Sequence, residues 1–310
     1  MKEYAALGLL AWFQNMIPAL LPFMIFTNLI LNLNLEEVIL KPLYLILEPF
    51  FKVRREMLFA ICIGFLCGFP MGSKVLSDLY RKGKISHVEA EYLLCFTNNI
   101  GPAYYLGFVC PVLLPEYRLS FLLFVQFGIP FCYGLFLRNI HYKNKIHFPC
   151  TATCITPILS DTASARLSSP SVRHPSDRIT IRRFAYALDD AINNGLIQIG
   201  ALGGYMILFN VLVWFPHFLL KDHPVPALFC HMSIEITGGL TEFARLLSSG
   251  QISISDRLLP VQSMLCLNGL CCLFQTIKFL KGTDLSIKKY MLHKIILCSI
   301  TVLFLTLSVI

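Results

Sequence analysis

One carboxylate stands inside a strongly apolar stretch of the sequence. Glu235 lies in the run FCHMSIEITGGL and is followed closely by Thr237, Gly238 and Gly239. A charged side chain at membrane depth is costly unless it faces a cavity or a partner. Such a carboxylate suits proton coupling or a hydrogen bond to a substrate. The alternative is a structural carboxylate paired within a helical bundle, and both interpretations are kept.

Side-chain amides mark two further places in apolar sequence. Thr97, Asn98, Asn99, Gly101 and Pro102 form the stretch TNNIGP. Amides can orient a polar solute without placing a fixed charge in the membrane, although a simple turn would use the same residue types.

The second amide-bearing stretch is LCLNGLCCLFQT, which contains Asn268 and Gln275. These two residues are seven positions apart, so they share one helix face if the helix continues through Gly269. Hydrogen bonding between helices is the alternative role for both amides.

Glycine and proline predict a break in the chain between these motifs and the N-terminus. Gly64, Gly68 and Gly72 recur every four residues, a spacing that lets helices approach closely in lipid. Pro70 stands inside the last interval and would free carbonyl groups that only protein or a water-filled cavity can satisfy at membrane depth. A broken membrane segment is therefore predicted at GFPMG.

The elements that position these residues must be membrane helices. The chain has 310 residues, of which 56% are hydrophobic and 14% charged, and its mean hydropathy is +0.66. A soluble domain usually carries about a quarter charged residues. The composition predicts an all-α polytopic membrane protein with roughly eight membrane segments, given about 20 residues per crossing. It excludes a nucleic-acid reader, a disulfide-stapled secreted domain and a disordered tail.

A polar stretch divides the sequence into two hydrophobic halves. Residues 138–183 contain eight Lys or Arg against two Asp, which predicts a cytoplasmic linker. We therefore divide the chain into a first membrane half at 1–140, a basic linker at 141–183 and a second membrane half at 184–310. Residues 73–94 are charged and amphipathic and are predicted to form a surface helical hairpin, with a capping box from Ser86 to Glu89.

Charge also sets the expected course of the second half. Residues 278–294 carry five Lys and should lie on the same side as the linker. Full crossings at 196–218, 225–247 and 258–280 would place them on the other side. We therefore predict that the Glu235 segment is re-entrant and that the C-terminus lies opposite the linker.

Enzyme and cofactor motifs are missing from the sequence. It contains no HExxH, GxSxG, P-loop or GxGxxG pattern, so we expect neither an enzyme nor a cofactor. Cys150 and Cys154 share the linker with His141 and His147, but CxxxC alone is a weak metal spacing. We expect no metal site.

At these same motifs the chain resembles the YlbJ-type sporulation integral membrane proteins, which contain nucleoside-recognition Gate domains. The resemblance is densest from Leu21 to Ile140, through LPFMIF, LEPFF, CGFPMGSKVLSDLYRKGKIS and TNNIGP. It resumes at GGYMILFNVL, EITGG and LNGLCCLFQT. Carried over residue by residue, the motifs fall on Gly68, Pro70, Gly72, Asn98, Asn99, Gly101, Pro102, Glu235, Thr237, Gly238, Gly239, Asn268 and Gln275.

The resemblance implies two Gate-type halves with broken or re-entrant helices. It also implies a carrier for a small organic anion, dipicolinic acid during endospore formation, in the bacterial cytoplasmic or outer forespore membrane. The implied partners are that substrate, the lipid bilayer and a coupling proton or sodium ion; a homo-oligomer is compatible with this role. The alternatives are a nucleoside-type solute transporter and a non-transporting assembly or regulatory component of sporulation.

Together these patterns give one hypothesis for the site. GFPMG and EITGG supply broken backbone, TNNIGP and Asn268 supply polar contacts, and Glu235 couples or gates transport. Half-helix N-termini would then hold a carboxylate without a fixed positive side chain. The basic residues of the 73–94 segment, Lys74 among them, are predicted to form a solvated cytoplasmic face.

Overall fold

The computed structural model describes residues 1–35, 38, 41–146, 181–252 and 257–309. Throughout these ranges the regular elements are helices. Most of the predicted linker, including His147, Cys150 and Cys154, lies outside the described residues.

Helices of the first half follow one another with short connections. They are α1 (Lys2–Ala11), η1 (Trp12–Met16), α2 (Ile17–Leu33), α4 (Lys41–Phe51), α5 (Arg55–Cys67), α6 (Met71–Arg81), α7 (His87–Leu94), α8 (Pro102–Tyr104), η2 (Tyr105–Leu113), α9 (Leu119–Leu123), η3 (Phe124–Gly128) and α10 (Ile129–Asn139). The second half consists of α11 (Ile181–Leu219), α12 (Pro224–Ile234), α13 (Ile236–Ser248), α14 (Leu258–Leu267), α15 (Gly269–Leu280) and α16 (Ile287–Val309).

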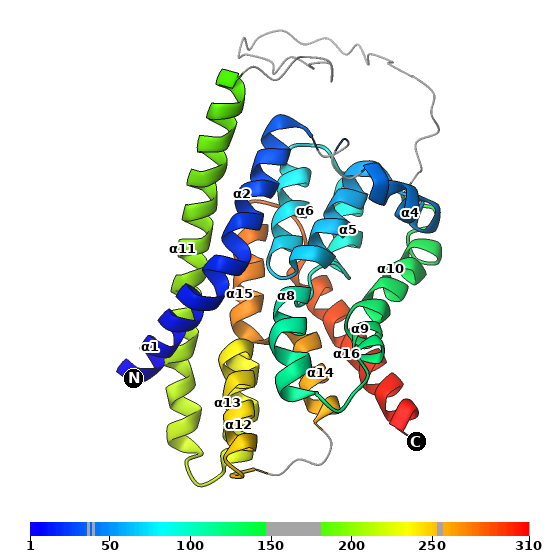
Figure 1. Cartoon of the computed structure of the whole chain (residues 1–310). Coiled ribbons are helices and arrows are strands. Elements are labelled where there is room, and N and C mark those ends of the chain that lie inside the picture. Colours follow the sequence, from blue (N-terminus) through cyan, green and yellow to red (C-terminus); the bar gives the residue numbers. More distant parts are fainter. Residues whose placement is uncertain (36–37, 39–40, 147–180, 253–256, 310) are drawn as a thin grey trace, which may run out of the picture.

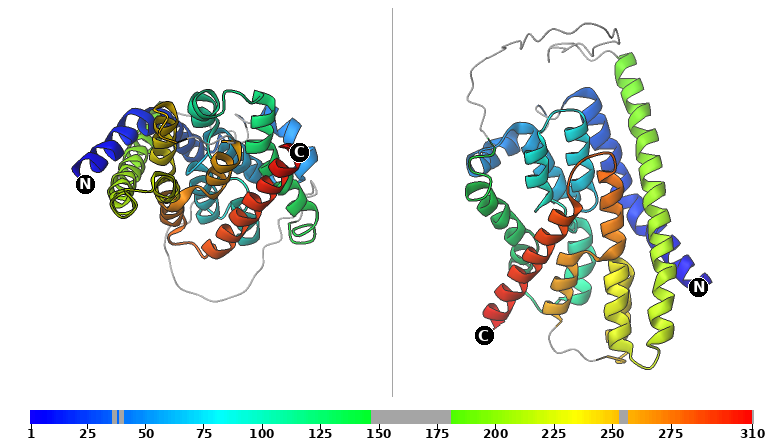
Figure 2. Two further views of the ribbon diagram at one scale, coloured as in Figure 1. Left: turned by 90° about the horizontal axis from the view of Figure 1, so that it is seen from below. Right: turned by 180° about the vertical axis from the view of Figure 1, so that it is seen from behind.

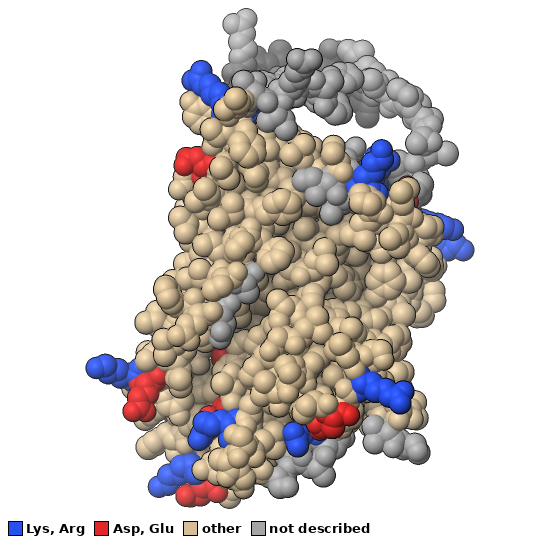
Figure 3. Space-filling view, viewed as in Figure 1, with Lys and Arg blue, Asp and Glu red and all other residues tan. Residues whose placement is uncertain are grey.

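The chain is an integral membrane protein. Four helical stretches of the described residues are long and apolar enough to cross a bilayer: Leu119–Asn139, Ile181–Leu219, Leu258–Leu280 and Ile287–Ser308. Charged side chains gather near the two ends of the face shown in Figure 3, with a broad uncharged band between them. We call the end that carries Asn139 and Ile181 the linker end, and the opposite end the distal end (Figure 1).

Two helical hairpins enter the molecule from opposite ends. Helices α5 and α6 run from the linker end to the middle and back, whereas α12 and α13 do the same from the distal end (Figures 1 and 2). Beside each hairpin runs a helix that is interrupted in the middle: α7 continues through residues 95–101 into α8 and η2, and α14 continues into α15. The second pair therefore repeats the first with inverted direction.

The predicted break at GFPMG is confirmed, because α5 ends at Cys67 and α6 begins at Met71. The predicted stretch 225–247 likewise consists of two helices that meet at Glu235. Both termini lie at the distal end in Figure 1, and the loop between α15 and α16 lies at the linker end.

The 73–94 segment is a hairpin, but the expectation of a surface hairpin is wrong. Its capping box is present, with Ser86 and Glu89 bonded in both directions. Most of α6 and α7 is buried, however, and Lys74 is only 1% exposed, where its Nζ donates to Asn28 Oδ1 at 2.6 Å and to Asp78 Oδ2 at 2.8 Å. The polar side of this amphipathic helix faces polar groups inside the protein. An amphipathic pattern in the sequence is the same whether the polar side faces water or buried polar groups.

The linker end joins the two halves through the last turn of α6. The Arg81 guanidinium donates to the carbonyls of Phe279 and Lys281 at 2.6 and 2.7 Å. The Tyr80 hydroxyl donates to Asp284 at 2.7 Å, and this hydrogen bond lowers the pKa of the Asp284 carboxyl. These contacts attach α6 directly to the end of α15.

The first membrane segment packs on the first helix of the second half. Trp12 Nε1 donates to the carbonyl of Ile199 at 2.8 Å, and Asn28 Nδ2 donates to that of Ala191 at 3.4 Å. A side chain on Gly203 would begin 2.4 Å from the Trp12 ring. The absence of a side chain at Gly203 therefore allows α1, η1 and α2 to lie against α11.

Candidate functional site

The tip of the α5–α6 hairpin touches the break between α7 and α8 backbone to backbone. A Cβ on Gly68 would lie 2.2 Å from Gly101 Cα, and a Cβ on Gly72 would lie 2.7 Å from the Thr97 carbonyl oxygen. Gly68 also has a φ of +72°, which favours glycine. The structure thus brings the predicted residues of GFPMG and TNNIGP into one contact, with Pro70 just before α6 and Pro102 opening α8.

The tip of the α12–α13 hairpin makes the corresponding contact with the break between α14 and α15. A Cβ on Gly269 would lie 3.1 Å from the Met232 carbonyl oxygen and 3.2 Å from that of Ser233. Gly239 packs against Met232 within the hairpin. Each hairpin therefore rests on the interrupted helix of its own half.

Between the two interruptions lies a buried lysine that the sequence analysis placed on the cytoplasmic side. Lys294 is 4% exposed. Its Nζ donates to the Asn98 carbonyl at 2.6 Å and to Asn99 Oδ1 at 2.9 Å. With its amide oxygen turned toward Lys294, Asn268 accepts from Nζ at 3.0 Å and donates to the Leu265 carbonyl at 2.6 Å. The side-chain amides of Asn99 and Asn268 and the backbone carbonyl of Asn98 therefore converge on this ammonium group from both halves.

The Asn98 side chain extends the cluster of polar groups around Lys294. Its Oδ1 accepts from the Ser73 backbone at 3.3 Å, and its Nδ2 donates to Thr276 Oγ1 at 3.1 Å and to the Tyr290 hydroxyl at 3.2 Å. Asn98 is fully buried. One residue therefore links α6, α15 and α16 at the point where the halves meet.

Lys294 corrects two expectations. The first was that the whole segment 278–294, with its five Lys, lies on the cytoplasmic side; α16 begins at Ile287, so Lys294 lies about two turns inside that helix. The second was that the site lacks a fixed positive side chain. A lone Lys preceding the long apolar run IILCSITVLFL was the pattern that could have indicated it.

The charge on Lys294 has no anionic partner among the residues that the structure describes. The ion pairs of these residues do not include it, and its three acceptors are the neutral oxygens of Asn98, Asn99 and Asn268. Buried charges in proteins are ordinarily paired, because an unpaired one is expensive to desolvate. All three N–H donors of this ammonium group are used by neutral oxygens, so an anion that bound Lys294 would replace one of these acceptors and supply the missing negative charge.

A cavity of about 410 Å³ lies against this lysine. Its lining includes Lys294, Tyr290, Ser233 and Gly269, together with apolar residues of α14, α15 and α16. Gly269 opens α15, whose first turn has no side-chain cap. The partial positive charge of a helix N-terminus adds to that of the ammonium group at this cavity.

Glu235 lies at the tip of its hairpin and is 2% exposed. Its carboxylate caps α13: Oε1 accepts from the Thr237 amide at 3.1 Å and from the Thr237 hydroxyl, and Oε2 accepts from the Gly238 amide at 2.6 Å. Cys272 on α15 is within electrostatic reach of both Glu235 and Lys294. The Glu235 carboxylate is thus buried, and its hydrogen bonds are made to residues of its own hairpin.

A shared face of Asn268 and Gln275 was expected only if one helix continued through Gly269, and this condition is not met. Asn268 has a φ of +67° and Gly269 one of +71°, so α14 ends before these residues and the helix does not continue. Gln275 is buried, and its Nε2 donates to Cys271 Sγ at 3.2 Å. The structure does not bring Gln275 to Lys294.

The described ranges contain no group of three His, Cys, Asp or Glu side chains placed to hold a metal ion. The metal possibility weighed for Cys150 and Cys154 lies outside those ranges.

The fold and its buried polar centre define a polytopic helical membrane protein with two inverted hairpins. The chain is 25% identical to the sporulation integral membrane protein YlbJ of Bacillus subtilis (strain 168), over 95% of this chain and 74% of that protein. This similarity confirms the resemblance to YlbJ-type proteins that the motifs indicated, and it supports a membrane role in sporulation. No protein-family model matches the chain. No solved structure matches it.

Proposed function

We propose that this protein is a carrier for a small organic anion and that Lys294 binds the substrate's carboxylate. The observation that carries the proposal is the buried ammonium group, hydrogen-bonded only to neutral oxygens among the described residues and lying against a cavity of about 410 Å³. A carboxylate entering the cavity would supply the missing negative charge.

The inverted arrangement supports transport rather than a purely structural role. In secondary transporters, substrate sites lie near the midplane between inverted repeats, at helices that are interrupted there. We interpret the α5–α6 and α12–α13 hairpins as re-entrant from opposite sides. Together with six crossings they give eight membrane segments in two Gate-type halves. The first set of crossings is α1–α2, α7–η2 and α9–α10; the second is α11, α14–α15 and α16.

Dipicolinic acid is the substrate we propose, during endospore formation and in the cytoplasmic or outer forespore membrane. Support comes from the similarity to a sporulation membrane protein and from the chemistry of the cavity. Carboxylates would pair with Lys294 and with the N-terminus of α15, and the planar ring would lie against apolar residues such as Leu270 and Met291.

The test is uptake of labelled dipicolinate into sealed proteoliposomes containing the full chain. Lys294→Gln keeps N–H donors for Asn98 and Asn99 but removes the charge. The matched control is Lys288→Gln, which removes an exposed Lys from the same helix. A charge-assisted hydrogen bond contributes about 1.5–3 kcal/mol. We therefore expect KM for dipicolinate to rise about 10- to 150-fold in Lys294→Gln, and to stay unchanged in the control.

Each alternative gives a different result. Saturable uptake of nucleosides instead of dipicolinate would favour the nucleoside-type transporter. No uptake of either by folded wild-type protein, under proton or sodium gradients, would favour the assembly or regulatory component. Glu235→Gln is expected to abolish uptake while the amount of protein stays unchanged, and full activity of that variant would remove Glu235 from the mechanism.

A further inference from the structure

A buried histidine on α12 has a ring nitrogen without a hydrogen-bond partner. His231 is 4% exposed, and its Nε2 is unpaired in the structure. The other ring nitrogen, Nδ1, lies 3.3 Å from Nε2 of His217 on α11, and the two rings are 5.3 Å apart at 82°. One side of His231 is therefore joined to a second histidine, and the other side is free.

The free nitrogen and the Glu235 carboxylate both lie beside Gly238, with no hydrogen bond between them. His231 Nε2 and Glu235 Oε2 each lie 2.9 Å from the point where a Gly238 side chain would begin, and Asn210 Oδ1 lies 3.0 Å from it. These three polar atoms share a space that any larger residue would fill. Because Asn210 uses its Nδ2 to donate to the Met206 carbonyl at 2.9 Å, its oxygen faces the histidine as an acceptor.

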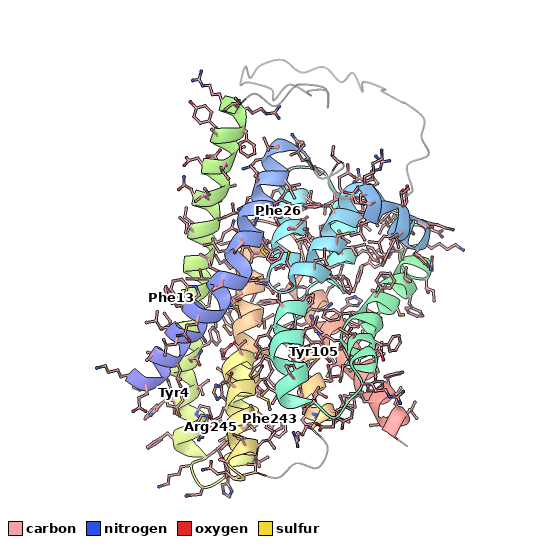
Figure 4. The ribbon with its side chains drawn as sticks, in the orientation of Figure 1. Tyr4, Phe13, Phe26, Tyr105, Phe243 and Arg245 are labelled. Atoms are coloured by element: carbon pink, nitrogen blue, oxygen red, sulfur yellow. The ribbon has the colours of Figure 1, made fainter. Side chains whose placement is uncertain are left out.

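From His217 the polar groups continue to the distal end. The His217 ring lies 5.7 Å from that of Tyr4, and Glu242 interacts electrostatically with both histidines. Glu242 pairs with Arg245 at 2.6 Å, and the Arg245 side chain is 60% exposed. Figure 4 shows Tyr4 and Arg245 near the distal end. Titratable groups thus extend from the surface to the hairpin tip.

We propose that His217 and His231 form a proton path from the distal end to Glu235, and that the coupling ion of the carrier is a proton. This inference rests on the proposed transport function. His217 takes a proton from the distal solution and passes it from Nε2 to His231 Nδ1. His231 releases the proton on its own Nε2 to a water molecule beside Gly238, and that water passes one of its protons to Glu235 Oε2, so one proton leaves the solution and one reaches the carboxylate.

Protonation of Glu235 would change the hairpin tip. The ionised carboxylate accepts hydrogen bonds from Thr237 and Gly238 and thereby caps α13. Hydrogen bonds to a charged acceptor are about twice as strong as those to a neutral one. A neutral Glu235 would hold the start of α13 less firmly, and the α12–α13 tip could then separate from Gly269.

Other ionisable groups surround this path. Besides His217 on α11, they are Tyr4 on α1, Tyr104 on α8, Glu242 and Arg245 on α13, and Cys271 and Cys272 on α15. Lys294 interacts electrostatically with Cys272. Any pH dependence assigned to the histidines must therefore be tested with histidine variants.

The experiment separates proton movement from substrate movement. Proteoliposomes containing the full chain and a trapped pH-sensitive dye are given dipicolinate, and proton entry is recorded. In parallel, exchange of labelled internal for unlabelled external dipicolinate is measured, a reaction that needs no net proton transfer. The variants are His231→Gln and His217→Gln, with the exposed His223→Gln as control.

We expect both path variants to lose at least tenfold of the dipicolinate-dependent proton entry while exchange stays within twofold of wild type. The control should match wild type in both assays. His231→Asn also removes the titratable ring, and it should show the same separation if the glutamine variant folds poorly.

Wild-type proton entry in folded His231→Gln, or wild-type uptake driven by sodium alone, would overturn the proton path and leave the carrier intact. Absence of dipicolinate exchange in wild type would instead overturn the proposed function, and the proton path with it.

Discussion

Gly68→Ala tests whether the hairpin tip and the interrupted helix must touch through backbone. The new Cβ would lie 2.2 Å from both Cα and N of Gly101, whereas carbon atoms in contact are normally about 3.5–4.0 Å apart. The tip would have to move away by more than about 1 Å. Overpacking of this kind costs about 1–3 kcal/mol, and the φ of +72° adds about 1–3 kcal/mol for a residue with a side chain.

The matched control is Gly83→Ala. Gly83 has a φ of +66°, but no atom of the residues that the structure describes lies within 4 Å of the Cβ that alanine would add. Its cost is therefore limited to the backbone, at about 1–2 kcal/mol. The difference between the two variants contains the contact with Gly101 and any additional backbone cost at Gly68, whose ψ is −160°.

The assay is thermal unfolding of the purified full chain in detergent. The measured quantity is the fraction of protein that remains monodisperse after heating to each temperature. Since 1 kcal/mol shifts Tm by about 2–4 °C in domains of 150–250 residues, we expect Gly68→Ala to unfold at least about 2 °C below Gly83→Ala. Equal Tm values for the two variants would refute the close approach.

Two further substitutions test packing elsewhere. Gly203→Ala would push the Trp12 ring from α11 and should lower stability by about 1–3 kcal/mol, whereas Gly204→Ala has open space and should not; thermal unfolding and Trp fluorescence would show it. Glu89→Gln removes the partner of Arg54, whose guanidinium donates to both carboxylate oxygens at 2.6 and 3.1 Å. We expect it to lower the free energy of unfolding by about 1.5–3 kcal/mol, and an unchanged denaturation midpoint would contradict a stabilising pair.

Local backbone chemistry could be predicted from the sequence. Pro70 with its flanking glycines marked a break, and Ser86 with Glu89 marked a helix start; both are confirmed. These features depend on a few adjacent residues, whose steric limits and hydrogen-bonding groups act over one or two helical turns. The four long apolar stretches could also be predicted, because hydropathy is a property of each continuous run of residues.

The direction in which polar residues face could not be predicted. Lys74 and Lys294 belong to charged segments that the charge rule places in water, yet both are buried on acceptors from distant parts of the chain, such as Asn28 and Asn98. Only the folded structure shows which distant residues supply these acceptors. At Asn268 and Gly269, two consecutive residues with positive φ ended α14 and changed the course of the helix that follows, so the spacing to Gln275 no longer described one face.

The packing of α1 and α2 on α11 has a consequence for synthesis. Trp12 finds its acceptor 187 residues later, at Ile199, and Asn28 finds its acceptor 163 residues later, at Ala191. These helices leave the ribosome before α11 and must therefore stay in lipid without this protein neighbour until the second half has been inserted. Two fragments made by cutting the chain between Ile146 and Ile181 would each lack this interface, and co-expression of both should restore it.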